Sequence, residues 1–403
     1  MAGNLRARLA LIRERAVNQS SANHSGKPAP SANGSGRRDE FPAGWASTGE
    51  GVRFKETIAA FGMTAPGAPM RLAAFSPRFG SSQTAWKDVI FFDLETTGLS
   101  GGSGTVAFLA ALGRWRADGT FSVRQYFIDD YPAEPLFLAC LESEFASAKA
   151  VVTYNGSSFD MPLYSVRRIM NGHGAAPRID HVDALHAARR LWRRTLVDCS
   201  LSTLERSVLG VERDDDIPGA QVPDAWFDFL KRGTADRLAR VFRHNEIDVR
   251  SLAALTVVIH QAANGGSEPV SCYLPGLAEL QSRLDVELAE ATLIRAMESG
   301  EERAVRPLMR LYGKHGRIDE KIALVPRLPD DAAGLFSKSV YAERREGDVR
   351  AALYLASRAE QSAEGILKDR AARRVERLRA KAEKAEAPVR IGRASEGSVS
   401  QPG

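Results

Sequence analysis

The chain has 403 residues, of which 44% are hydrophobic and 26% are charged. That length suggests two or three domains, and the apolar share supplies a sizeable core, so a collagen-like or wholly disordered chain is excluded. No apolar run approaches the roughly 18 residues that a membrane span needs. The first residues, Met1–Arg6, carry charge where a secretory signal needs an apolar stretch, and the 3 cysteines are far apart. We therefore expect a cytoplasmic protein in a reducing setting.

Positive charge is concentrated at the two ends of the chain. Residues 1–50 hold 7 Lys/Arg and 4 Asp/Glu (net +3), and residues 365–403 hold 10 and 5 (net +5). Because the whole chain carries +5, the middle is left with −3. Basic ends can act as loose nucleic-acid arms or as solubilising tails, and both interpretations are open. Residues 1–50 are also rich in Ser and Gly, which predicts a disordered basic segment.

The predicted elements begin after residues 51–84, which we interpret as a lead-in to the fold. β-branched and aromatic residues dominate 89–95, which is typical of a buried strand. An apolar run at 106–112 and an alternating run at 121–127, preceded by the hairpin signal Asp118-Gly119, extend this strand into an antiparallel meander. The pattern then alternates between helices and strands, which implies crossovers and parallel pairing. These later elements are a helix near 134–148, a strand at 150–154, a helix at 163–170, an apolar stretch at 179–182 and a long helix from 235 to about 260.

The sequence therefore predicts an α/β domain over residues 85–262. Its mixed sheet has three antiparallel strands followed by βα units, and helices flank the sheet. The stretch 264–269 contains Gly and Pro and marks a domain boundary. From about residue 275 the pattern is helical, and Gly316 and Gly347 lie 31 residues apart, close to the 34-residue tetratricopeptide period. We interpret 275–362 as a small tetratricopeptide-like region of helical hairpins, and 363–403 as a charged helix with a disordered basic tail.

Acidic side chains at three places in the α/β domain suggest a metal site. Asp93 and Glu95 lie two residues apart on a strand, so both project from one face. Two acids on one face repel each other unless a cation lies between them, and oxygen ligands suit Mg²⁺ or Mn²⁺. Asp160 follows the second strand and turn, and His244 and Asp248 share one face of a helix. Each piece also has an ordinary interpretation, namely solvated acids at a strand end, a helix N-cap and a surface i,i+4 pair.

In this order the segments resemble the DEDD 3′→5′ exonuclease superfamily, which has a ribonuclease H-like fold. The motifs are D-x-E-T-T-G-L at 93–99, N-G-x-x-F-D at 155–160 and a final Asp preceded by His at 244–248. The finer resemblance is to the YprB-type ribonuclease H-like exonuclease family, and it covers about residues 85–260. Its marks are Phe92–Gly102, Tyr154-Asn155-Gly156 with Phe159-Asp160, Asp216–Gly219 and His244-Asn245 with Asp248.

The resemblance implies a phosphodiester hydrolase that uses two divalent cations. The implied ligands of two Mg²⁺ or Mn²⁺ ions are Asp93, Glu95, Asp160 and Asp248, with Asp93 bridging the pair. His244 would accept or orient the proton of the attacking water. The implied substrate-binding residues are Thr96, Thr97, Leu99 and Asn155.

His244 departs from the superfamily pattern. The fifth active-site residue of these enzymes is either Tyr four positions before the last Asp or His five positions before it, and His244 stands at the Tyr spacing. Four residues of a helix correspond to about 40° of rotation and five to about 140°. We still expect His244 to lie over Asp248, and we expect Glu246 to face elsewhere.

Two further features are open to more than one interpretation. Arginines crowd around Trp192, at positions 189, 190, 193 and 194, and could contact phosphates while Trp192 stacks on a base. A solvated helix face explains the same run. Asp214–Asp216 is expected to be a loop.

Three functions fit the sequence. The first is a metal-dependent 3′→5′ exonuclease that acts on single-stranded ends of DNA or RNA. The second is a nucleic-acid-binding or scaffold protein that cuts little and uses its C-terminal helices to bind a protein partner. The third is a structure-selective endonuclease on the same fold. None of the three requires a membrane.

Overall fold

The computed structural model describes residues 41–48, 50–59, 65–98, 104–174 and 178–386. The chain divides into two compact units between Ala289 and Glu290, a boundary that falls inside helix α9 (Val286–Glu298). Residues 1–40 and 387–403, which were predicted to be disordered, lie outside the described residues. The prediction of disorder is wrong for the end of the first segment, because Phe41 and Trp45 pack against the core and Ala46–Ser47 form a strand. Among the residues that are described, no helix is long and apolar enough to cross a membrane.

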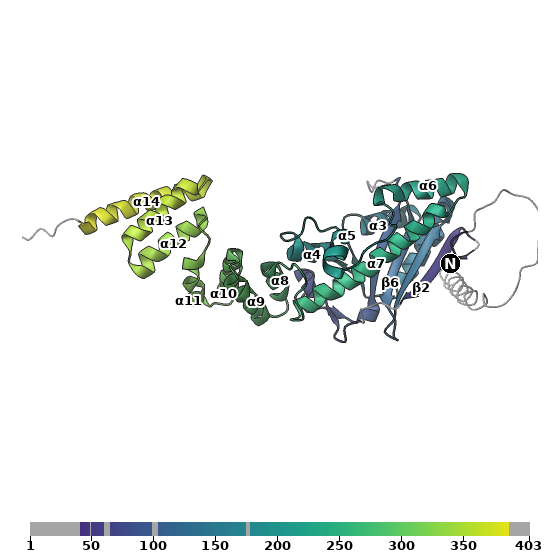
Figure 1. Ribbon diagram of the computed structural model, residues 1–403, viewed down its shortest axis with the longest axis horizontal. Coiled ribbons are helices and arrows are strands. Elements are labelled where there is room, and N and C mark those ends of the chain that lie inside the picture. Colours follow the sequence, from purple (N-terminus) through teal and green to yellow (C-terminus); the bar gives the residue numbers. More distant parts are fainter. Residues whose placement is uncertain (1–40, 49, 60–64, 99–103, 175–177, 387–403) are drawn as a thin grey trace, which may run out of the picture. The chain divides into compact units, whose positions relative to one another are not determined.

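A mixed sheet of 7 strands forms the centre of the first unit (Figure 1). Its order is β1-β2-β7-β6-β5-β8-β9. The first five strands in this order pair antiparallel, and β8 and β9 are added in parallel. The predicted mixed sheet is therefore confirmed. The strands are β1 (Ala46–Ser47), β2 (Val52–Ala59), β5 (Val89–Thr96), β6 (Ala107–Trp115), β7 (Phe121–Ile128), β8 (Ala150–Thr153) and β9 (Asp180–Asp183).

The predicted lead-in, residues 51–84, contributes more to the fold than its sequence predicts. Within it, β2 pairs with β7 along its whole length, from Val52 opposite Ile128 to Ala59 opposite Phe121. A separate two-stranded sheet, β3 (Met70–Arg71) with β4 (Gln83–Thr84), follows. The meander is thus extended by a strand that precedes it in sequence.

Helices pack on both faces of the large sheet, and successive side chains of β5 therefore lie in two different cores. Phe92 lies in one core with residues of α2 and α3, and Phe91 lies in the other with residues of α4, α7 and α8. The helices of this unit are α2 (Glu134–Phe145), α3 (Asp160–Met170), α4 (Ala184–Trp192), α5 (Leu201–Leu204), α6 (Val222–Arg232), α7 (Asp236–Ala263) and α8 (Leu274–Gln281). Short helical turns are η1 (Leu72–Ala74), η2 (Pro77–Phe79), η3 (Trp86–Asp88), η4 (Tyr131–Ala133), η5 (Glu205–Leu209) and η6 (Gly219–Gln221).

The long helix α7 runs across the sheet (Figure 1) and approaches it closely at Gly113 of β6. A Cβ atom at Gly113 would lie 2.5 Å from Cγ1 of Val249 and 2.6 Å from Cζ of Phe121. Only a residue without a side chain allows this approach. The contact fixes the middle of α7 against β6, and with it the residues that precede Val249.

The second unit is helical throughout its described residues, 290–386, as the sequence predicted. A buried Arg374 joins its last helices, donating to the hydroxyl and the carbonyl of Ser339 and to Glu343. The tetratricopeptide-like assignment stays a prediction. Besides the end of α9, the helices are α10 (Val305–Lys314), α11 (Ile318–Ala323), α12 (Ala332–Tyr341), α13 (Val349–Ser362) and α14 (Gly365–Glu386), with the turns η7 (Glu302–Ala304), η8 (Val325–Arg327) and η9 (Ala342–Glu346).

Candidate active site

Asp93 and Glu95 lie near the end of β5 and alternate with Phe92 and Leu94, which are buried in the opposite core. Both acids therefore face α7, as the two-residue period of a strand predicts. The pairing of β5 with β6 shifts register between Glu95 and Thr96. The extra residue is Phe108 on β6, because Leu109 is opposite Glu95 and Ala107 is opposite Thr96. The acids thus stand where the regular sheet ends.

The turn after β8 places Asp160 next to this strand. Asn155 has a left-handed backbone (φ 63°), and its N–H donates to Oδ1 of Asp183 at 2.8 Å. At Gly156 a Cβ atom would lie only 2.4 Å from the Thr153 hydroxyl and 2.8 Å from Oδ2 of Asp160. The chain therefore turns tightly into α3, and Oδ1 of Asp160 accepts from the N–H of Leu94 at 3.3 Å. This bond ties the start of α3 to β5.

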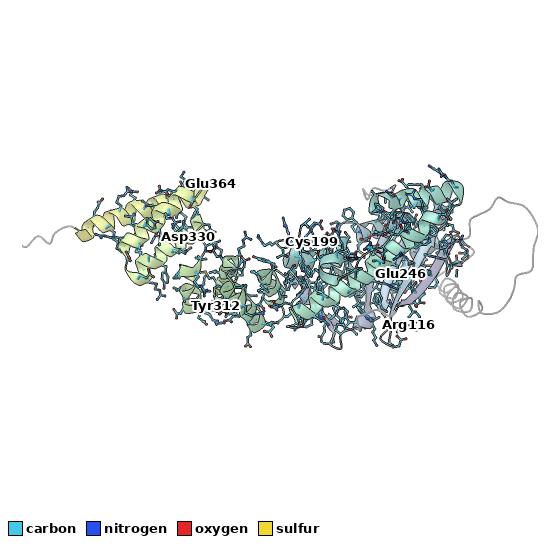
Figure 2. The ribbon with its side chains drawn as sticks, in the orientation of Figure 1. Arg116, Cys199, Glu246, Tyr312, Asp330 and Glu364 are labelled. Carbon is cyan, nitrogen blue, oxygen red and sulfur yellow. The ribbon has the colours of Figure 1, made fainter. Side chains whose placement is uncertain are left out.

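Helix α7 supplies three polar side chains above the sheet, of which Asn245 is wholly buried. Its Nδ2 donates to Oδ2 of Asp93 at 2.7 Å, and its Oδ1 accepts from Nε2 of Gln125 at 3.1 Å. Asn245 therefore holds Asp93 in place. Asn245 is part of a family motif in the sequence, but its role could not be predicted from that motif. Glu246, labelled in Figure 2, pairs with Arg250 at 2.7 Å and lies 3.8 Å from Lys55 of β2, so it faces elsewhere, as expected from its place on the helix.

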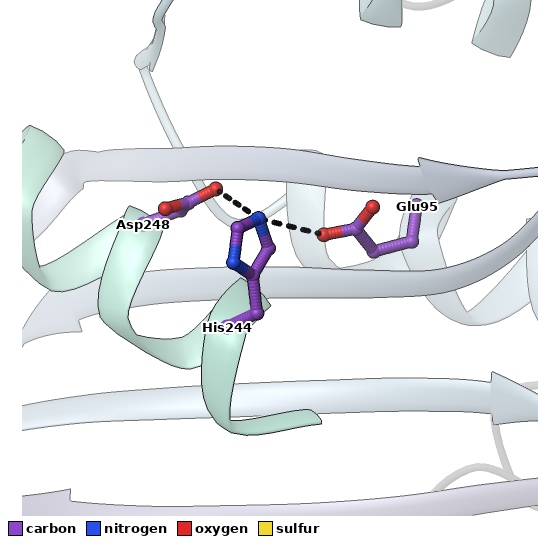
Figure 3. A group of neighbouring side chains, drawn as sticks. All are labelled: Glu95, His244 and Asp248. Atoms are coloured by element: carbon purple, nitrogen blue, oxygen red, sulfur yellow. Dashed lines mark ion pairs between the residues drawn. The ribbon is translucent and has the colours of Figure 1, made fainter. Parts of the chain in front are cut away.

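The other two side chains of α7 form a compact group with β5. Nε2 of His244 lies 3.5 Å from Oδ2 of Asp248 and 4.0 Å from Oε1 of Glu95 (Figure 3). Ligand atoms of Glu95, His244 and Asp248 all lie within 4.8 Å of one another. His244 thus lies over Asp248, as its spacing predicts. The carboxylates of Glu95 and Asp248 suit a divalent cation such as Mn²⁺, and the imidazole of His244 lies beside them.

Electrostatics in this region indicate an uncompensated negative charge. Burial raises the pKa of Asp93 well above its ordinary value, and the neighbouring carboxylates, Asp248 first, raise it further. Burial and the charge of Asp248 also raise the pKa of Glu95 well above its ordinary value. Burial raises the pKa of Asp160 to about 7, although hydrogen bonds from backbone N–H groups oppose the change. A bound cation would stabilise all of these carboxylates in their charged form.

An arginine from the segment after η5 also enters the site. Arg213 donates to Oδ1 of Asp248 and forms two bonds of 2.6 Å to the buried carboxylate of Glu205. Its Nη1 lies 3.2 Å from Oδ2 of Asp216, whose Oδ1 is 2.7 Å from Nδ1 of His244. Neither Arg213 nor Glu205 was identified from the sequence. Asp216 was expected to lie in a loop. The sequence signal that could have identified it is the motif Asp216–Gly219, which belongs to the family resemblance.

The predicted substrate-binding residues lie around the same strand end. The Thr96 hydroxyl donates to the carbonyl of Gly98 at 2.8 Å, and the Thr97 hydroxyl accepts from the N–H of Val106 at 3.0 Å. Both hydroxyls thus stabilise the turn after β5. Asn155 lies in the neighbouring turn, and Leu99 lies outside the described residues. The contacts of these four residues with a nucleotide stay predictions.

Base stacking by Trp192 is the one binding feature that the structure contradicts. Its side chain is fully buried, and its indole N–H donates to the carbonyl of Val270 at 3.0 Å. The indole ring of Trp192, the last residue of α4, is packed in the core, so no base can stack on it. Arg189, Arg193 and Arg194 remain exposed at the end of this helix.

Comparisons with known proteins agree with this fold. Residues 90–260 match the family model described as the RNase_H superfamily. The chain is 32% identical over 250 residues to the uncharacterized protein YprB of Bacillus subtilis strain 168. That match spans 60% of this chain and 60% of the length of YprB.

The mixed sheet, the acids at its strand ends and the family match define the first unit as a member of the ribonuclease H superfamily, which has a nuclease-type fold. More narrowly, the chain is similar to YprB over the matched 250 residues, in line with the resemblance stated from its motifs.

Proposed function

We propose that the protein is a metal-dependent 3′→5′ exonuclease that hydrolyses the terminal phosphodiester bond of single-stranded DNA or RNA. The observation that carries this proposal is the group of acids between β5, α3 and α7, three of which have raised pKa values. An arrangement that costs stability unless a cation is bound is typical of a metal-dependent active site.

The residues that would hold two Mg²⁺ or Mn²⁺ ions are Asp93, Glu95, Asp160 and Asp248. When bound, such ions lower the pKa of a water molecule and stabilise the charge that develops on the leaving oxygen. Asp93 reaches this group with its carboxylate fixed by Asn245. Asp248 shares its charge with Arg213 through Oδ1, so Oδ2 is the oxygen that faces His244.

In this proposal His244 acts on the attacking water. Its Nε2 faces Glu95 and Asp248, where a water held by these carboxylates and their cation would lie. An imidazole at that place can accept the proton that water loses as it attacks phosphorus. Thr96 and Thr97, at the end of β5, are the proposed contacts of the terminal nucleotide.

Degradation of a 5′-labelled single-stranded oligonucleotide in Mn²⁺ tests the reaction. An exonuclease gives a ladder that shortens from the 3′ end, and a 3′-phosphate should block it while a 5′-phosphate should not. Asp93→Asn should abolish cleavage, and Asp88→Asn serves as the matched control because Asp88 pairs with Lys149 outside the acid group. A single discrete product would instead favour the endonuclease. Binding without cleavage by the wild type would favour the scaffold function.

A further inference from the structure

Asp216 is surrounded by hydrogen-bond donors that leave little freedom to its carboxylate. Oδ1 accepts from the N–H of Ile217 at 2.9 Å and lies 2.7 Å from Nδ1 of His244. Oδ2 accepts from Nη1 of Arg213 at 3.2 Å. The neighbouring Asp215 differs, because its carboxylate is exposed and pairs with Arg240 at 3.1 Å.

This environment determines which nitrogen of His244 carries the proton. A carboxylate oxygen only accepts, so the 2.7 Å contact requires a proton on Nδ1 of His244. In the neutral ring Nε2 then has a free lone pair. That lone pair faces Oδ2 of Asp248 and Oε1 of Glu95, which is the direction in which a proton acceptor is needed.

Arg213 competes for the same nitrogen. Its Nη1 lies 3.1 Å from Nδ1 of His244, and a guanidinium can only donate. If Arg213 were the partner of Nδ1, the ring proton would have to move to Nε2, and His244 would direct a donor at the acids. The shorter contact to Asp216 favours the first arrangement.

We propose that Asp216 is a positioning residue that fixes the tautomer and the orientation of His244 so that Nε2 is free to accept a proton. The inference rests on the proposed hydrolase function for its kinetic consequence. Its structural consequence is independent of any reaction. Arg213, braced by two bonds to buried Glu205, holds Asp216 from the other side.

The structural consequence is tested on the full-length, metal-free chain labelled with ¹⁵N-histidine. At a pH where the ring is neutral, ¹⁵N chemical shifts distinguish a protonated from an unprotonated ring nitrogen, and His244→Ala assigns the signals. We expect the Nδ1-protonated form in the wild type. In Asp216→Ala, Arg213 becomes the remaining partner of Nδ1, so the Nε2-protonated form should dominate. Asp215→Ala should leave the wild-type signals unchanged.

The kinetic consequence is tested on the same variants with a labelled oligonucleotide in Mn²⁺. Asp216→Ala should lower kcat by roughly 10–100-fold, the usual effect of removing an outer partner of an active-site group, with KM nearly unchanged. Asp216→Asn can keep an oxygen opposite Ile217 and His244, so it should recover much of kcat and the Nδ1-protonated signal. Asp215→Ala is the matched control here too.

The outcomes separate the two claims. An Nε2-protonated His244 in the wild type, or an Nδ1-protonated His244 in Asp216→Ala, would overturn the positioning role. An inverted tautomer in Asp216→Ala without cleavage by any form of the chain would retain the positioning role and overturn the proposed reaction. If Asp216→Ala fails to fold, Asp216→Asn tests the positioning role. A loss of kcat in Asp216→Asn while His244 keeps its Nδ1-protonated form contradicts that role.

Discussion

Asp93 is the residue at which stability and the proposed activity oppose each other. Its pKa is raised above the ordinary value of 3.8 by burial and by neighbouring carboxylates, so the stability of the metal-free fold falls as the pH rises from that ordinary value to the raised pKa, and it stays reduced above it. Asp93→Asn removes the charge and keeps an oxygen for the bond from Asn245. We therefore expect the metal-free variant to be more stable than the wild type at pH 8, by on the order of 1 kcal/mol. The difference should vanish below about pH 3, where the acid is protonated in both states.

Urea unfolding followed by tryptophan fluorescence measures this effect, because all 5 tryptophans precede residue 289 and report the first unit. Saturating Mn²⁺ should raise the unfolding midpoint of the wild type, since a ligand at 100 times its Kd contributes about 2.7 kcal/mol. The gain should be lost in Asp93→Asn and kept in Asp88→Asn. A variant that is less stable than the wild type and still responds to Mn²⁺ would remove Asp93 from the metal site.

His260 illustrates a titratable residue with a structural role. Its side chain is 3% exposed, and its Nε2 accepts from the N–H of Arg71 at 3.0 Å, which requires a neutral ring. Burial first, and then the charge of Arg71, lower its pKa to about 4. Between pH 6.5 and pH 4 the unfolded state takes up a proton that the folded state does not, so stability is lost as the pH falls. The expected contribution is about 3 kcal/mol over this window.

His260→Gln keeps a side chain that can accept from Arg71 but does not titrate. Unfolding free energies between pH 7.5 and pH 4 should therefore fall less steeply in His260→Gln than in the wild type. His315→Gln, at an exposed position in the second unit, should follow the wild type. Equal pH dependence in all three proteins would mean that the fold does not lower the pKa of His260.

At the scale of elements, the contact between Gly113 and α7 links the core to the site. Gly113→Ala would place a Cβ atom 2.5 Å from Val249, next to Asp248. The helix must move, so we expect a loss of roughly 1–3 kcal/mol in stability, the usual cost of overpacking. Cleavage should fall as well, because α7 carries His244 and Asp248. Gly67→Ala is a suitable control, since nothing lies within 4 Å of a Cβ atom at Gly67. Unchanged stability in Gly113→Ala would show that α7 is not fixed at this point.

Local pattern was enough to predict the elements that hold the acids. Strands β5 to β8 and helices α2, α3 and α7 begin and end within a few residues of the predicted limits, because each has a clear apolar period. Strand β2 was not predicted, since Lys55 and Glu56 interrupt its alternation and give an outer strand a polar character. Its place beside β7 depends on pairing across about 70 residues of chain, which no local pattern records.

The same limit applies to the site. Asp93 and Glu95 could be predicted to share a face because their spacing on one strand requires it. Arg213 could not be predicted to pair with Asp248, because it comes from an irregular segment whose path depends on the packing of η5 against α7. Ion pairs between distant segments depend on the assembled fold. The sequence therefore predicts the acids better than the cations that surround them.

At the scale of the whole molecule, the net positive charge belongs to the second unit. Residues 1–289 hold 32 Lys/Arg and 32 Asp/Glu, whereas residues 290–403 hold 23 and 18, a net charge of +5. On α14 basic residues recur at spacings of three and four and so share one face of the helix. These residues are Arg370, Arg373, Arg377, Lys381 and Lys384. Glu343 pairs with Arg377 and Lys381, at 2.5 and 3.1 Å.

The remaining three residues of this face are exposed. We expect them to contact the phosphates of a bound nucleic acid. The triple variant Arg370→Gln, Arg373→Gln, Lys384→Gln should bind a long single-stranded oligonucleotide more weakly than the wild type. Each lost contact with a single strand reduces the slope of log K against log salt by about 0.7, so the full loss is about 2. Glu376→Gln with Glu383→Gln, which removes two exposed acids from the same helix, should act in the opposite direction. Fluorescence anisotropy between 50 and 300 mM salt, on the metal-free chain so that no cleavage occurs, measures both. A triple variant with the wild-type slope would mean that this face is a solvated surface, and that the positive charge of the second unit takes no part in nucleic-acid binding.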